Sequence, residues 1–278
     1  MRVMAEMPGA FPEALAAVCA LLGLMVGSFL NVVIHRLPRM MSAREADRRV
    51  RLRGEIPAPR PAYNLAVPRS ACPQCGRSIT ALENVPVLSW LMLRGRCRGC
   101  RAPISARYPA VEALTGMLSG VMAWQFGWGL ALAAALIFTW AVVSLAFIQF
   151  DTGQLPDAIT LPLVLAGLAF NLGGCFVHPG QAILGAMAGW VILATIRWLA
   201  ARSAGYDLLG RGSPLLGSAA GAFFGLAPLP WLLAFWAILV LTGRLLLRRG
   251  PLPVGLCFAI ASLSLLAWHW PAALPAAG

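Results

Sequence analysis

The sequence predicts an all-α protein that crosses a membrane several times and carries a small metal-binding domain outside it. The composition is 59% apolar and 12% charged, with a mean hydropathy of +0.76. Soluble domains are about one-quarter charged, so this is the composition of a membrane protein. Apolar runs near the length of a membrane-spanning helix, about 20 residues, recur along the chain. Four closely spaced cysteines lie in the basic segment that separates the first run from the others.

Eight apolar segments are predicted to be membrane helices. They are residues 14–34, 111–128, 130–150, 158–177, 182–199, 214–226, 231–247 and 254–268. The sixth is short, and Gly217, Gly221 and Gly225 recur in it every four residues. This spacing places small residues on one helix face, which is typical of helices that pack closely on a neighbour.

The distribution of arginine predicts the orientation. The chain has 22 basic residues, all arginine, and fifteen of them lie between Arg36 and Arg107, against four acidic residues there. Arginine-rich loops stay in the cytoplasm, so this segment is predicted to be cytoplasmic and both termini periplasmic. The charge has no aromatic platform or nucleic-acid motif beside it, which argues against nucleic-acid binding. We therefore divide the chain into residues 1–34 (first membrane helix), 35–107 (cytoplasmic domain) and 108–278 (seven-helix membrane domain). Within the second, we expect residues 43–68 to form a loop.

Cys72, Cys75, Cys97 and Cys100 form the pattern C-x2-C-x21-C-x2-C. Two such pairs surround a metal tetrahedrally, and four thiolates favour zinc. The alternative of two disulfides is disfavoured in the reducing cytosol. Because four thiolates leave no open coordination position, the predicted zinc is structural.

Several motifs now resemble one family. The first span ends in Gly27-Ser-Phe-Leu-Asn, the cysteine module contains Ser89-Trp-Leu and is followed by Arg107-Tyr-Pro, and Leu155-Pro-Asp-Ala-Ile-Thr comes later. From about Gly27 to Gly225 the chain resembles the type IV prepilin leader peptidase/N-methyltransferase family. The resemblance implies a bacterial inner-membrane enzyme that acts on type IV prepilins or type II secretion pseudopilins. An intramembrane aspartic peptidase removes the basic leader at the cytoplasmic face, and S-adenosylmethionine then methylates the new amino terminus.

The resemblance also implies positions for the functional residues. The glycine that is linked to methylation in the family corresponds to Gly95. The two catalytic aspartates correspond to Gln149, eight residues before Asp157, and to Ser213, which ends Gly210-Arg-Gly-Ser213. Neither a carboxamide nor a hydroxyl replaces a carboxylic acid as a proton donor and acceptor near neutral pH. The sequence therefore predicts that no intact peptidase dyad is present. No Gly-x-Gly-x-x-Gly motif marks a methyl-donor site.

Three interpretations stay open. The chain is an N-methyltransferase whose peptidase half has decayed, a non-catalytic assembly factor for pili or secretion, or an active peptidase with a displaced dyad. For the third, the remaining acids near the predicted cytoplasmic ends of the spans are Asp151, Asp157 and Asp207. Pairing Asp151 with Asp207 requires shifts of about two and six residues from the family positions. Each residue turns a helix by about 100°, so the side chains would no longer face one another.

Overall fold

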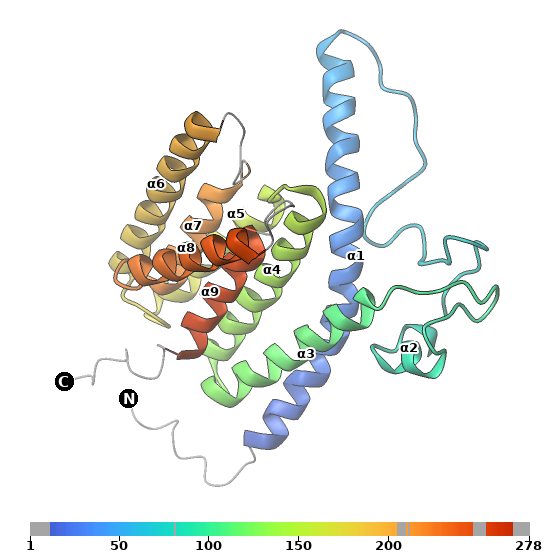
Figure 1. Ribbon diagram of the computed structural model, residues 1–278, viewed down its shortest axis with the longest axis horizontal. Coiled ribbons are helices and arrows are strands. Elements are labelled where there is room, and N and C mark those ends of the chain that lie inside the picture. The colour runs from blue at the N-terminus through green and yellow to red at the C-terminus, as the bar shows by residue number, and fades with distance from the viewer. Residues whose placement is uncertain (1–11, 81, 205–209, 211, 247–253, 269–278) are drawn as a thin grey trace. The chain divides into compact units, whose positions relative to one another are not determined.

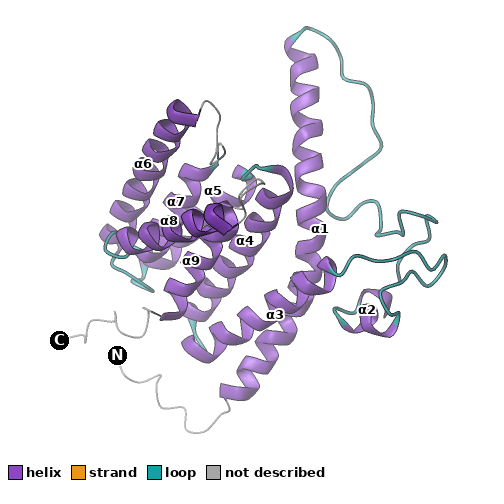
Figure 2. Cartoon of the chain, in the orientation of Figure 1, coloured by secondary structure: helices purple, strands orange, loops and turns teal. Residues whose placement is uncertain are grey.

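The computed structural model describes residues 12–80, 82–204, 210, 212–246 and 254–268. Within these residues the regular elements are helices, and the β-structure consists of isolated bridges (Figures 1 and 2). The elements are α1 (Pro12–Leu52), η1 (Leu82–Asn84), α2 (Leu88–Met92), α3 (Arg107–Phe126), α4 (Leu130–Thr152), α5 (Asp157–Leu172), α6 (Pro179–Ala204), α7 (Ser213–Phe224), α8 (Leu229–Leu246) and α9 (Val254–Trp268). The predicted all-α fold is confirmed.

Three helices are long and apolar enough to cross a membrane: α1, α4 and the Pro179–Arg202 part of α6. Shorter apolar helices lie at Asp157–Leu172, Ser213–Phe224, Leu229–Gly243 and Val254–Ala267. Helix α3 coincides with most of the second predicted span. Each predicted span thus corresponds to a helix, whereas the number of membrane crossings and their orientation stay predictions.

One expectation about the cytoplasmic segment is wrong. Residues 43–68 do not begin as a loop, because α1 continues without interruption to Leu52. The segment lacks an apolar period, but alanine, arginine and glutamate are strong helix formers. Arg49 also pairs with Glu45 one turn earlier, with Nη2 2.6 Å from Oε1. The helix ends only before Gly54, whose φ is +77°.

The chain divides into two compact units, one of residues 19–118 and one of residues 1–18 and 119–278. In the unit of residues 19–118, α1 and α3 approach closely. A Cβ on Gly27 would lie 2.8 Å from the Glu112 Cα, and one on Gly116 would lie 2.9 Å from the Leu24 side chain. Asn31 donates to the Tyr108 carbonyl at 3.1 Å. Glycines thus allow the two backbones to meet.

In the other unit, α6 and α7 pack together through glycines. A Cβ on Gly185 would collide with the Gly221 carbonyl oxygen, and one on Gly189 would collide with the Gly217 carbonyl oxygen. The predicted close packing of the sixth span is therefore present at Gly217 and Gly221, and the partner helix is α6.

Helices α5 and α7 are joined by a buried side chain at the end of α5. The Asn171 amide donates to the carbonyls of Ala222 at 2.8 Å and Phe223 at 3.2 Å, and its oxygen accepts from the Phe176 backbone at 2.7 Å. These bonds satisfy carbonyls that the end of α7 leaves without helical partners. The C-terminal end of α7 is thereby fixed against α5. Ser213 is the first residue of α7, at its opposite end.

Candidate functional site

The four cysteines come together as the sequence predicts. Their Sγ atoms all lie within 4.8 Å of one another, and Cys72 Sγ is 3.8 Å from Cys100 Sγ. Thiolates bound to a tetrahedral zinc ion at about 2.3 Å are about 3.8 Å apart. The donor set and its spacing therefore fit a four-thiolate metal site, and the predicted cluster between the first two long helices is confirmed.

Two matching turns build the cluster. In the first, the Cys72 N–H donates to Arg77 O and the Gly76 N–H donates to Cys72 O, both at 2.9 Å. In the second, the Cys97 N–H donates to Ala102 O at 2.8 Å and the Arg101 N–H donates to Cys97 O at 3.0 Å. The residue after each second cysteine is left-handed, with φ of +70° at Gly76 and +62° at Arg101. Each turn thus presents two sulfurs on the same side.

The thiols differ in acidity. The backbone N–H groups of Cys75 and Gln74 lower the pKa of Cys72 to about 6. The Ala102 N–H favours the Cys100 thiolate, but burial and the neighbouring thiols outweigh it and raise the pKa of Cys100 to about 11. A divalent cation would displace the remaining protons, because metal binding requires thiolates.

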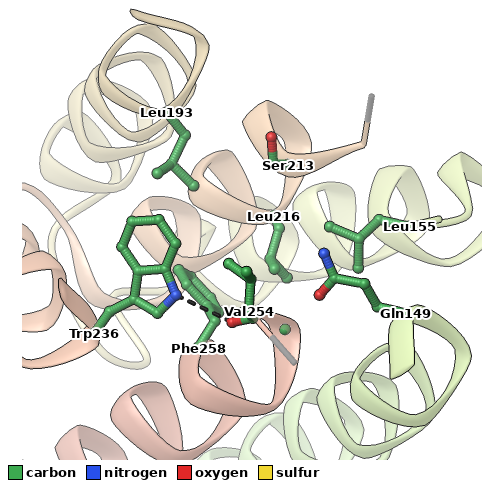
Figure 3. A pocket seen from close by; sticks show the side chains of 9 residues that line it. Gln149, Leu155, Leu193, Ser213, Leu216, Trp236, Val254 and Phe258 are labelled. Carbon is green, nitrogen blue, oxygen red and sulfur yellow. Dashed lines mark hydrogen bonds between the residues drawn. The ribbon is translucent and has the colours of Figure 1, made fainter. Parts of the chain in front are cut away.

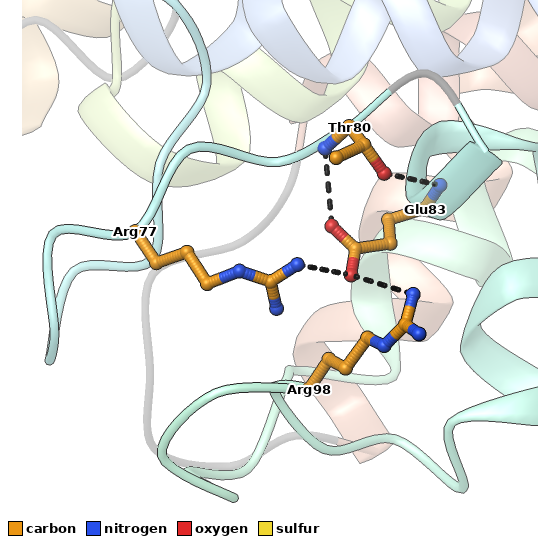
Figure 4. A network of polar contacts seen from close by, with 4 residues as sticks. All are labelled: Arg77, Thr80, Glu83 and Arg98. Atoms are coloured by element: carbon orange, nitrogen blue, oxygen red, sulfur yellow. Dashed lines mark hydrogen bonds and ion pairs between the residues drawn. The ribbon is translucent and has the colours of Figure 1, made fainter.

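Glu83 joins the two turns from outside (Figure 4). Its carboxylate accepts from Arg77 Nη2 at 2.9 Å and from the Thr80 N–H at 3.1 Å, and lies 3.8 Å from Arg98 Nη1. Arg77 belongs to the first turn and Arg98 to the second. The Thr80 N–H and the Arg77 guanidinium hold the pKa of Glu83 below its ordinary value.

Gly95 lies at the entrance to the second turn. Its φ is +65°, its N–H donates to Trp90 O at 2.8 Å, and its carbonyl accepts from the Ile104 N–H at 2.7 Å. The Trp90 indole N–H donates to Ile104 O at 3.1 Å. The left-handed backbone favours glycine at this position, and the adjacent ring leaves no room for a Cβ. Its link to methylation stays a prediction.

Gln149 and Ser213 line the same small cavity, which has room for roughly one water molecule (Figure 3). Gln149 lies near the end of α4 and Ser213 begins α7, and both side chains are buried. The other lining residues are Leu155, Leu193, Leu216, Trp236, Val254, Gly255 and Phe258. The fold therefore brings together the two positions that the resemblance aligns with catalytic aspartates.

The cavity offers little acid–base chemistry. Its lining, as far as the structure describes the chain, contains no carboxylate or imidazole. The Ser213 hydroxyl donates to the Gly210 carbonyl at 2.9 Å, so its proton is directed at the backbone. The Gln149 side chain lies against Gly255, where a Cβ would collide with its Oε1.

The remaining acids lie elsewhere. Asp151 and Asp157 are exposed, and neither lines the cavity. Asp157 begins α5, where a carboxylate favourably meets the helix dipole. Asp207 lies outside the described residues.

Sequence reasoning did not anticipate the side of the cavity formed by α8 and α9. The Trp236 indole donates to the Val254 carbonyl at 3.1 Å and meets the Phe258 ring edge-on, with centroids 6.3 Å apart (Figure 3). Trp236 and Phe258 resemble ordinary apolar residues of a membrane helix, and no local pattern distinguishes them.

Comparisons with known proteins agree with these motifs. Residues 21–126 match the family described as Bacterial Peptidase A24 N-terminal domain, and residues 136–245 match the Type IV leader peptidase family. The chain is 45% identical over 281 residues to a prepilin leader peptidase/N-methyltransferase of Aeromonas hydrophila, covering 96% of each chain. It is 42% identical to the protein of that name from Neisseria gonorrhoeae, covering 82% of this chain and 81% of the other, and 40% identical to that from Pseudomonas aeruginosa, covering 92% and 91%. No solved structure matches the chain. With identity of this order over nearly its whole length, the chain belongs to the prepilin leader peptidase/N-methyltransferase family.

Proposed function

We propose that this protein retains the N-methyltransferase function of its family and has lost the aspartic peptidase function. Its substrates are the amino-terminal segments of type IV prepilins or type II secretion pseudopilins. They are bound at the cytoplasmic face of the bacterial inner membrane. The chain crosses this membrane eight times, with both termini in the periplasm and the four-cysteine domain in the cytoplasm, where a reducing environment keeps the thiols free.

The observation that carries the proposal is the shared cavity of Gln149 and Ser213. Their convergence supports the alignment of both positions with the catalytic aspartates. Aspartic proteolysis requires one ionised carboxylate that takes a proton from water and one protonated carboxyl that polarises the scissile carbonyl. The cavity has a carboxamide and a hydroxyl in these places. Asp151 and Asp157 do not replace them, since both are exposed outside the cavity.

Zinc fits the cysteine cluster in number, type and spacing of donors. Cys72, Cys75, Cys97 and Cys100 would hold the ion. Its part is structural: it fixes the two turns between which Trp90 and Gly95 lie. Closed four-thiolate coordination offers no position for a substrate.

S-adenosylmethionine supplies an electrophilic methyl group when it is bound. The acceptor is a free amino terminus, which must lose a proton to attack. We assign no residues to the methyl donor. The intact surroundings of Gly95 support retention of this half of the activity, because the contacts of its N–H, its carbonyl and the neighbouring indole are all made.

A host that lacks its own prepilin peptidase allows the two activities to be separated. The full-length protein is produced there with a prepilin, and the purified protein is also incubated with a mature pilin amino-terminal peptide and isotopically labelled S-adenosylmethionine. Mass spectrometry then reports leader removal and methyl transfer independently. We expect labelled methyl groups on the mature peptide and an uncleaved leader on the prepilin.

The other outcomes decide between the remaining interpretations. Leader removal would show that an active dyad exists, and Asp151→Ala, Asp157→Ala and Asp207→Ala would identify its members. Absence of both reactions, with the prepilin still co-purifying, would instead favour a non-catalytic assembly factor.

A further inference from the structure

The short helix α2 presents its apolar side chains outward. Leu88, Leu91 and Met92 occupy positions i, i+3 and i+4, which lie on one helix face. Their exposed fractions are 54%, 58% and 76%. Trp90, on the other side of the helix, packs against Gly95 inside the module. A domain surrounded by water would bury such a face, so its exposure points to a partner.

A hydrogen bond fixes the depth of α2. The backbone N–H of Val87, the residue that precedes α2, donates to Glu112 Oε2 at 2.7 Å. Val87 has a φ of +59°, which is unusual for a β-branched residue. Glu112 follows Val111, the first residue of the second predicted span. If the predicted span marks the hydrocarbon, α2 begins level with the point where α3 enters it.

Two cations follow α2 directly. Arg94 and Arg96 are exposed, and neither forms an ion pair with another residue that the structure describes. Arg77 and Arg98 of the same module, in contrast, are directed at Glu83. A guanidinium group binds phosphate oxygens in a two-pronged geometry, and anionic lipids attract basic residues near the membrane surface.

We propose that α2, together with Arg94 and Arg96, is an interfacial anchor that lies in the bilayer surface. Leu88, Leu91 and Met92 enter the acyl region, and the two arginines bind the phosphates of anionic headgroups. The predicted orientation makes this the cytoplasmic leaflet. The anchor would hold the cysteine module on the membrane surface next to α3, whichever enzymatic activity the chain retains. Apolar residues beside cations at the boundary are the pattern of segments that lie in a membrane surface.

Photocrosslinking in nanodiscs tests the position of α2. The full-length protein carries benzoylphenylalanine in place of Leu91, and mass spectrometry identifies lipid adducts. Met25, 66% exposed within the first predicted span, is the lipid-facing control. Ile56, 94% exposed, is the cytoplasmic control, because it follows the end of α1 and Leu52 lies about 27 Å along the helix from Ile34. We expect lipid adducts at positions 91 and 25 and none at 56. If position 91 forms no more lipid adducts than position 56, the proposal is overturned.

Hydrogen exchange tests the role of the arginines. Amides of residues 88–96 should exchange more slowly in nanodiscs that contain phosphatidylglycerol than in purely zwitterionic ones. Arg94→Gln with Arg96→Gln should abolish this difference, which we expect to be about fivefold per arginine. The matched control, Arg51→Gln with Arg53→Gln at the far end of α1, should retain it. Equal exchange in both lipids would contradict the anchor. Replacement of the lipid adducts at position 91 by adducts to an added prepilin would assign this face to a protein partner instead.

Discussion

The indole ring of Trp90 lies so close to Gly95 that a Cβ at position 95 would be 2.8 Å from the Trp90 Cζ2 atom. The ring is fixed in place, because its N–H donates to Ile104 O while the Ile104 N–H donates to Gly95 O. Any side chain at position 95 must displace the ring or break these hydrogen bonds. Glycine at position 95 thus has a physical reason that the sequence alone does not supply.

Gly95→Ala should disturb the module by two separate effects. A non-glycine residue at a φ of +65° costs about 1–2 kcal/mol, and displacement of Trp90 adds a packing cost on the order of 1–3 kcal/mol. We expect slower methyl transfer to a mature pilin peptide, together with faster hydrogen exchange at the Ile104 amide.

Gly76→Ala is the matched control. Gly76 has a φ of +70° in the same module, but a Cβ added to it would meet nothing within 4 Å. It should show the backbone cost without the effect on Trp90. If the Ile104 amide exchanges equally fast in both variants, the contact with the Trp90 ring is not the reason for glycine at position 95.

The purified protein should contain about one zinc ion per chain, bound by the four cysteines. Replacing Cys72 by serine should remove most of the metal and destabilise residues 70–104, because structural zinc contributes folding free energy directly. Elemental analysis together with limited proteolysis measures both effects. Cys257→Ser, which changes a buried cysteine of α9, should leave the zinc content unchanged. A metal-free protein with four reactive thiols would contradict the zinc assignment.

Glu83 should make the stability of the cysteine module depend on pH. Its folded-state pKa lies below the unfolded value of about 4.3, so the ionised form is favoured by folding. The stabilisation is present above a pH of about 4.3 and is lost as the pH falls through the lower, folded-state pKa. Glu83→Gln should therefore be less stable than the wild type at neutral pH, and the gap should close on acidification.

Comparing the two proteins at each pH removes the effect of acid on the thiolates, which both share. Hydrogen exchange of residues 77–98 is the measurement. Glu45→Gln serves as the control, because the Glu45–Arg49 pair is exposed to solvent and contributes little. If the difference in stability between the wild type and Glu83→Gln stays constant throughout acidification, the ion pairs of Glu83 are not its cause.

The helices and the cysteine cluster could be predicted because each depends on local patterns. An apolar run of membrane length and a pair of C-x2-C motifs each specify their own structure. The continuation of α1 to Leu52 could not be predicted in this way, since it depends on the helix propensity of its residues and not on an apolar period. The association of Asn171 with the end of α7 was also inaccessible, because a polar residue near the end of an apolar run carries no sign of its distant partners.

The candidate peptidase site also combines features that could be predicted from the sequence with features that could not. The positions of Gln149 and Ser213 came from aligned motifs, and the fold places both at one cavity. The apolar wall from α8 and α9 did not follow from the sequence. Trp236 acts there through one hydrogen bond to the Val254 backbone and one ring contact, and both depend on how the helices pack.

The double variant Gln149→Asp with Ser213→Asp should restore some leader cleavage. At position 149, aspartate is one methylene shorter than glutamine, so this change vacates part of the space beside Gly255 that the Gln149 amide fills. Either single change should stay inactive, since one carboxylate cannot serve as both acid and base at once. A single positioned general acid or base contributes on the order of 10² to 10⁴-fold to the rate, and the pair should contribute more.

The measurement is conversion of a prepilin to its mature form in a host without its own prepilin peptidase. Gln149→Asn with Ser213→Asn is the matched control, because it reproduces the size of the two aspartates without their acidity. Cleavage by the aspartate pair alone would show that acid–base groups were what the cavity lacked. In a contrary result, neither double variant cleaves the prepilin although both still bind zinc and prepilin. That result would refute the idea that only two side chains separate this chain from an active peptidase. The apolar wall around Leu216 and Val254 would then be the next feature to change.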